Sequence, residues 1–143
     1  MKIQAGLLAP VLAAAVAAHA PFTQAQEAKY VRSKVKLNNQ AGFVAHTHNV
    51  CFLNGPMPPE FAQLEIGEIY TIRKGYGSVD LLYLPMANEA RRYGADAIVE
   101  FHGDHRGSMN VLRMSMPTGQ GKLVKLTDEA QAFDCKVLGG FEN

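Results

Sequence analysis

The sequence has almost no excess of either charge. Its 14 Lys and Arg residues face 13 Asp and Glu residues, and charged residues make up only 19% of the chain. Nucleic acids and anionic membranes attract proteins with a strong excess of basic residues, which this chain lacks. We therefore expect no nucleic-acid partner and no binding to anionic lipid surfaces.

The sequence also lacks the motifs of several common enzyme classes. It contains no Gly-x-Ser-x-Gly elbow, no phosphate-binding glycine loop and no His-Glu-x-x-His helix. Cys51 would serve as a nucleophile, with His46 or His48 as its base, only if its thiol were free. These absences predict a protein that is not an enzyme.

Cysteine is scarce, with only Cys51 and Cys135 in the chain. No cysteine follows the apolar N-terminal run directly, so lipid attachment there is not expected. Two cysteines in an oxidising compartment usually pair. We predict a disulfide between them, and two separately buried thiols are the alternative.

The longest apolar stretch lies at the N-terminus. Lys2 precedes Ala5–Ala18, which is almost entirely Ala, Leu and Val. This run is short and rich in alanine for a membrane span, and small residues follow it, as in a secretory signal peptide. We predict a signal peptide over residues 1–25, and a retained anchor is the alternative.

The cleavage site that we favour is Thr23-Gln-Ala25, because Pro21 would follow a cut after Ala20. Cleavage removes Lys2 and no acidic residue, so 13 basic residues face 13 acidic ones in residues 26–143. We predict a periplasmic or secreted protein that has no membrane span after processing. Its partner would be an envelope protein or a second copy of the chain.

The first half of the mature chain alternates between strand and turn patterns. The expected elements are an edge strand or frayed arm starting near Ser33, a strand over Phe43–Leu53 broken near Asn49, a Gly55–Pro59 loop, and a strand over Phe61–Lys74 with a bulge at Gly67.

One helix follows, with apolar residues at spacings of three and four from Val79 to Tyr93. Ser78 is its expected cap. Pro85 either kinks this helix or lies in the opening turn of a helix that restarts there. Gly94 should end it with a positive φ, and Ala97, Val99 and Phe101 of the next strand should pack against it.

The second half of the mature chain has more turn signals. The expected elements are a Gly103–Gly107 turn, a strand over Ser108–Met116, a Pro117–Gly121 turn, a short strand over Lys122–Leu126, a helical turn from Thr127 or Asp128 to Phe133, and a tail over Gly139–Asn143. This order predicts a single α+β domain in which a small mixed or antiparallel sheet packs against one main helix.

Three segments in this order resemble the YbjQ/RcsF-like domain family. They are Ile66-Gly-Glu-Ile69, the run from Ala90 through Gly94 to Val99, and Gly121-Lys-Leu-Val-Lys-Leu126. The resemblance covers about Val50 to Leu126 and implies a small α+β domain over residues 26–143. Its relatives include domains with a heavy-metal-binding label that tend to form rings, and a lipid-anchored envelope stress sensor with several disulfides. This chain lacks the lipid-attachment cysteine and the cysteine cluster. The resemblance therefore does not imply that it binds heavy metals or senses envelope stress.

Histidines form the one candidate ligand site in the sequence. His46 and His48 have a spacing of two, which places both on one face of a strand, and His102 and His105 flank a strand end. Glu100 shares a strand face with His102. Imidazole and carboxylate are ligands for zinc and copper(II). We predict a non-catalytic exported binding domain whose ligand or partner the sequence does not name. The alternative is a site for zinc or copper, which requires these residues to converge.

Overall fold

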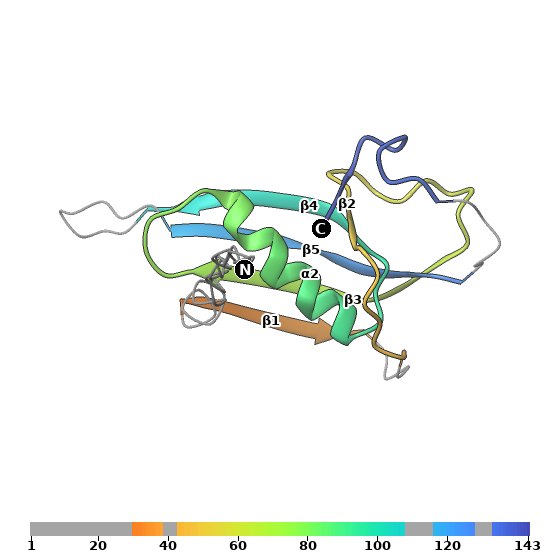
Figure 1. The fold of residues 1–143 in the computed structure, drawn as a ribbon, viewed down its shortest axis with the longest axis horizontal. Coiled ribbons are helices and arrows are strands. Elements are labelled where there is room, and N and C mark those ends of the chain that lie inside the picture. The colour runs from red at the N-terminus through yellow and green to blue at the C-terminus, as the bar shows by residue number, and fades with distance from the viewer. Residues whose placement is uncertain (1–29, 39–42, 108–115, 128–132) are drawn as a thin grey trace, which may run out of the picture.

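The computed structural model describes residues 30–38, 43–107, 116–127 and 133–143. In this part of the chain a six-stranded sheet lies against one helical segment (Figure 1), in the strand order β1-β3-β5-β4-β2-β6. The strands are β1 Val31–Leu37, β2 Cys51–Phe52, β3 Gln63–Arg73, β4 Ala97–Arg106, β5 Met116–Leu126 and β6 Phe141–Glu142. Only β2 and β4 pair in parallel, so the predicted mixed sheet on one main helix is confirmed. The domain contains more strand than we expected.

The predicted signal peptide lies outside the described residues. So do most of the expected helical turn from Thr127 or Asp128 to Phe133 and most of the expected strand at 108–116. In the described ranges we find no helix that is both long and apolar enough to span a bilayer.

The helical segment begins with a 3₁₀ turn, η1 Val79–Leu82, and continues directly into α2 Tyr83–Arg92. Pro85 lies in the opening turn of α2, where a missing N–H breaks no intrahelical hydrogen bond, so the second of our alternatives is correct. Ser78 stands at the start of η1 but its side chain makes no capping hydrogen bond. Gly94 has a φ of 75°, as predicted, and its N–H donates to the Arg91 carbonyl at 3.1 Å.

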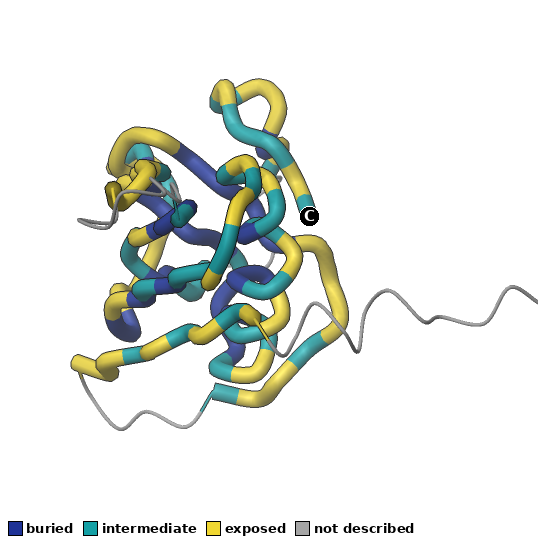
Figure 2. Tube along the Cα trace, turned by 90° about the vertical axis from the view of Figure 1, so that its left-hand side faces the viewer, coloured by how far each residue is buried: buried dark blue, intermediate teal, exposed yellow. Residues whose placement is uncertain are grey.

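Two apolar clusters hold the domain together, and Figure 2 shows the buried residues gathered inside it. The larger cluster lies between the helix and the sheet. Its fully buried side chains include Leu82, Met86, Ile98 and Leu123. The smaller cluster uses alternate residues of the same strands and therefore lies on the opposite face of the sheet. Its members are Cys51, Leu53, Met57, Ala97, Val99, Val124 and Cys135.

A bulge in β4 makes one of our packing predictions wrong. Ala97 and Val99 belong to the smaller cluster, whereas Ile98 and Phe101 face the helix. Glu100 has a φ of 50°, and the β4–β5 register shifts between Val99 and His102. Two residues of β4 therefore lie opposite one residue of β5, and the alternation of side chains is reversed beyond the bulge. The predicted bulge near Gly67 of β3 is confirmed by a register shift between Glu65 and Gly67.

The predicted Pro117–Gly121 turn is wrong, because β5 is one continuous strand. The predicted strand over Lys122–Leu126 is correct but forms only the second part of β5. Its glycines are packing residues. A Cβ on Gly119 would lie 2.9 Å from Met86 Sδ, and one on Gly121 would lie 2.6 Å from Ile98 Cγ2. Likewise, β4 continues through Gly103 to Arg106, so the expected Gly103–Gly107 turn is a strand end.

The two edges of the sheet can also be compared with the predictions. Of the expected strand at Phe43–Leu53, only Cys51–Phe52 forms one, as β2. The expected Gly139–Asn143 tail contains β6, which pairs antiparallel with β2. At the other side of the sheet, β1 is an edge strand, which is one of the two alternatives that we expected near Ser33.

Candidate functional site

The structure separates the two histidine pairs that we expected to share a metal ion. His46 Nε2 lies 2.9 Å from the Ala95 carbonyl oxygen, just before β4. His105 lies near the far end of β4, with its Nε2 3.2 Å from the Gly77 carbonyl oxygen. At about 3.3 Å per strand residue, the two positions are about 30 Å apart. One ion therefore does not reach both pairs.

Glu100 and His102 lie between these two ends, on the face of the sheet away from the helix. The Glu100 carboxylate accepts a hydrogen bond from Lys122 Nζ at 2.9 Å, and His102 pairs with Gln120 across the strands. His105 follows on the opposite face because side chains alternate along β4. Within the described ranges, no set of three or more His, Cys, Asp or Glu side chains is arranged to hold a metal ion. The prediction of one shared site is thus not supported.

The environment of His46 is more specific than its sequence context indicated. A carbonyl oxygen only accepts hydrogen bonds, so His46 Nε2 must donate to Ala95 and carries the proton. The same nitrogen lies 3.4 Å from Asp96 Oδ1. His46 Nδ1 is buried and has no hydrogen-bond partner among the described residues. The His48 ring lies next to it, with the ring centroids 5.4 Å apart.

His46 and His48 lie in the irregular segment 43–50, which contacts Asp96 and Arg91. Asp96 accepts hydrogen bonds from Lys125 Nζ at 3.0 Å and from a backbone N–H at the end of β5 at 2.8 Å. Arg91, in the last turn of α2, donates to the His48 carbonyl at 2.8 Å, and its own carbonyl accepts from the His46 N–H. The segment thus closes one side of a hollow of about 760 Å³, whose walls include His46, His48, Asn49, Asp96, Lys125 and Glu142.

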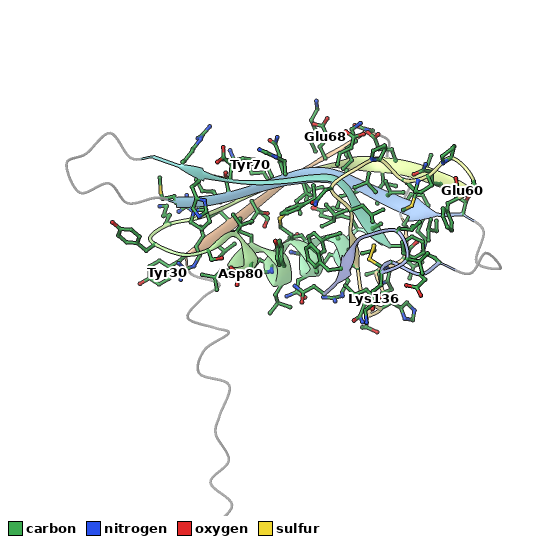
Figure 3. All side chains as sticks on the ribbon, turned by 90° about the horizontal axis from the view of Figure 1, so that it is seen from above. Tyr30, Glu60, Glu68, Tyr70, Asp80 and Lys136 are labelled. Carbon is green, nitrogen blue, oxygen red and sulfur yellow. A yellow bond between two sulfur atoms is a disulfide. The ribbon has the colours of Figure 1, made fainter. Side chains whose placement is uncertain are left out.

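A second hollow, of about 530 Å³, lies on the helix-free face of the sheet. Figure 3 shows Glu68 and Tyr70 of β3 on the side of the sheet away from the helix. Neighbouring strands add side chains at the same level, since Lys34 pairs with Tyr70 and Tyr70 pairs with Gln120. The polar residues of this hollow are Lys34, Lys36, Glu68, Tyr70, Glu100, Gln120 and Lys122. We call this surface the helix-free hollow.

Charges of both signs meet in the helix-free hollow. The hydrogen bond from Lys122 to Glu100, aided by nearby Glu65 and Glu68, raises the pKa of Lys122 above its usual value. Lys34 forms no ion pair with another described residue. The Tyr70 hydroxyl is covered and has no hydrogen-bond partner in the described ranges. Buried polar groups usually have a hydrogen-bond partner, so this hydroxyl is an exception within the described ranges.

Sequence analysis missed this surface, although a signal for it exists. Polar residues recur at a spacing of two in each strand, in step with the period of a strand. They are Arg32, Lys34 and Lys36 of β1, Glu68 and Tyr70 of β3, and Gln120 and Lys122 of β5. The signal is readable only if residues 117–121 are recognised as part of a strand. Their proline and two glycines concealed it.

The predicted Cys51–Cys135 disulfide is confirmed. The two Cα atoms lie 5.7 Å apart, within the range that a disulfide requires. Both cysteines are almost fully buried, at 1% and 0% exposure. The bond therefore staples β2 to the C-terminal segment, and the paired Cys51 is not a free thiol nucleophile.

Comparison of the chain with protein-family models, with curated proteins and with solved structures gave no match.

Proposed function

We propose that this protein is an exported, non-catalytic binding domain that uses the helix-free hollow to bind a ligand or a partner in the cell envelope. The observation that carries this proposal is the hollow itself. One face of the sheet is covered by the helix, while the opposite face keeps polar side chains from four strands exposed around a concavity of about 530 Å³. Such a volume is typical of a ligand site.

Export is supported by two features that are independent of the hollow. A buried disulfide forms and persists in oxidising compartments. The N-terminal residues have the pattern of a cleaved leader, with the cut after Ala25. We expect the protein in the periplasmic or secreted fraction, with no thiol alkylated before reduction. An intact Met1 in the membrane fraction would overturn this part of the proposal.

The resemblance to YbjQ/RcsF-like domains belongs to the same proposal. Its support is the order of α2, the Gly94 stop, β4 and the strand that contains Gly121. The comparisons add nothing to it. The resemblance bears on the fold and does not identify a ligand.

Binding through the hollow is testable by crosslinking in intact cells. A photo-reactive residue at Gln120 lies in the hollow, whereas the same residue at Asn88 lies on the exposed side of α2. We expect an adduct from position 120 and none from position 88. Native mass spectrometry of the protein released from the cells tests for a small ligand instead. Equal labelling at both positions, together with no retained ligand, would refute the hollow as the binding surface.

Binding of a metal ion remains a second candidate, restricted to His46 and His48. Ligating histidines commonly donate their other ring N–H to a carbonyl or carboxylate, and His46 Nε2 is engaged in this way by Ala95 and Asp96. That engagement leaves His46 Nδ1 as the nitrogen for copper(II) or zinc, with the His48 ring beside it.

The metal candidate has a matched control at the far end of β4. Copper(II) and zinc are titrated into chelator-treated protein, and the titration is repeated with His46→Ala and with His105→Ala. We expect His46→Ala to abolish binding and His105→Ala to leave it unchanged. Equal weak binding by all three proteins would remove this candidate.

A further inference from the structure

The strand β1 forms the longer edge of the sheet in the described part of the chain. It pairs with β3 through a continuous register of seven residues, from Val31 opposite Arg73 to Leu37 opposite Gly67. No other strand pairs with it in the part of the chain that the structure describes. The opposite edge is β6, with only two residues. Since alternate residues of an edge strand direct their N–H and C=O groups outward, β1 is the edge that offers a ladder for another strand.

The two faces of β1 differ in chemistry. Arg32, Lys34 and Lys36 are exposed on the helix-free side, and none of them forms an ion pair with another described residue. On the helix side, Val35 packs against the larger apolar cluster and Leu37 is 44% exposed. A strand added beside β1 would therefore meet cations on one face and, apart from Ser33, apolar side chains on the other.

We propose that β1 binds an extended acidic segment of a partner protein, which adds to the sheet as a further strand. Acidic residues at alternate positions of that segment lie beside Arg32, Lys34 and Lys36, and apolar residues between them lie beside Val35 and Leu37. Opposite charges on neighbouring strands attract, and the backbone ladder supplies affinity that does not depend on side chains.

The same charges argue against a second copy as the occupant. In an antiparallel pair of two β1 strands centred on Lys34, that residue faces its own copy, and Arg32 faces Lys36. Like charges placed opposite one another destabilise strand pairing. An acidic segment removes this repulsion, so charge complementarity selects it over self-association.

This inference rests on the proposed function, because it names the chemistry of a partner that reaches the sheet beside the helix-free hollow. Edge-strand lysines also have a purely protective role, in which they prevent aggregation through free edges. The two roles differ in outcome, since a protective edge binds no acidic strand.

The test uses three synthetic peptides of seven residues and the oxidised protein. The first alternates Glu and Val, the second has the same side chains but N-methyl groups at every second residue, and the third replaces Glu by Lys. Fluorescence anisotropy measures affinity, and amide hydrogen exchange measures protection of β1. We expect the first peptide to bind and to protect β1, and the other two to bind at least about tenfold more weakly.

Two charge-reversal variants provide the matched control. Lys34→Glu should weaken binding of the Glu-Val peptide by about tenfold, whereas Lys136→Glu, the same change on the exposed C-terminal segment, should leave it unchanged. Equal binding of the plain and N-methylated peptides would overturn strand addition, and so would the absence of binding. Dimerisation through β1 in sedimentation would overturn the selection against a second copy. Crosslinking at Gln120 is independent of these results, so failure at β1 is distinguishable from failure of the proposed function.

Discussion

Replacing Gly94 by alanine should destabilise the fold through two separate effects. The φ of 75° is a left-handed conformation, which costs an L-residue about 1–2 kcal/mol. In addition, a Cβ at this position would lie 2.6 Å from Phe43 Cβ and 2.9 Å from the Val44 carbonyl oxygen. Neither atom is the free end of a flexible side chain, so the added methyl group should cost a further 1–3 kcal/mol or so. We expect Gly94→Ala to lower the free energy of unfolding by roughly 2–5 kcal/mol in urea titration of the oxidised protein.

Two other glycines separate the conformational effect from the contact. Gly139 has the same φ of 75° but no atom within 4 Å of an added Cβ, so Gly139→Ala should cost about 1–2 kcal/mol. Gly55 has neither constraint, so Gly55→Ala should be neutral or should gain about 0.4–1 kcal/mol from the unfolded chain. Equal losses for Gly94→Ala and Gly139→Ala would refute the reasoning, because they would show that the chain near Phe43 does not pack on Gly94.

Three further changes test other contacts of the structure. Replacing Cys51 and Cys135 together by serine opens a loop of 84 positions and should lower stability by about 4–5 kcal/mol in urea titration, whereas a loss below about 1 kcal/mol would contradict the entropic estimate. Glu100→Gln should lower the pKa of Lys122, as measured by NMR titration of its Nζ. The pKa of Lys122 is higher in the folded protein than in the unfolded chain. The stabilisation by this pair is therefore present below pH 10.5 and is lost as the pH rises through the folded-state pKa of Lys122. Asp96→Ala leaves a β5 backbone N–H without its acceptor and should cost about 1–3 kcal/mol by thermal or urea unfolding, with Asp96→Asn costing less, and equal losses would show that the charge and not the acceptor matters.

The helix, its glycine stop and the start of the strand that follows were predictable because local signals there agree with the tertiary structure. Apolar residues at helical spacing define α2, and basic residues occupy its last turn. Gly94 marks its end by conformation and by close contact with a neighbouring segment. The Cys51–Cys135 bond was predictable for another reason, since two cysteines offer only one intramolecular pairing.

The strand β5 was not predictable from local signals, because its turn residues have a packing function. Gly119 and Gly121 face the helix, where Met86 and Ile98 leave no room for a Cβ. Sequence reasoning reads such glycines as turns because conformational freedom is their commonest use. The contacts that exclude larger residues come from Met86, Ile98 and Phe101, which are distant in the chain.

The two histidine pairs do not share a metal site because the fold places them far apart. The chemistry of the residues themselves is suited to a metal ion. A spacing of two or three residues places side chains locally, and it carries no information about the distance between two pairs in different segments. β4 extends through His102 and His105 as a strand, so it carries them away from His46. What the sequence could not provide was the continuation of this strand beyond Gly103.

The bulge in β4 links the apolar core to the candidate binding surface. Since Ile98 faces the helix, a regular strand would turn Glu100 toward the same apolar cluster and Phe101 toward the helix-free face. A buried carboxylate without a partner is strongly disfavoured, and so is an exposed phenylalanine next to an unfilled core. The extra residue resolves both conflicts, because Phe101 enters the larger cluster and Glu100 reaches Lys122 on the helix-free face. The spacing of three between Ile98 and Phe101, with an acid between them, is therefore a sequence signal for the bulge. The extra residue of the bulge thus both completes the larger apolar cluster and places the Glu100 carboxylate in the helix-free hollow.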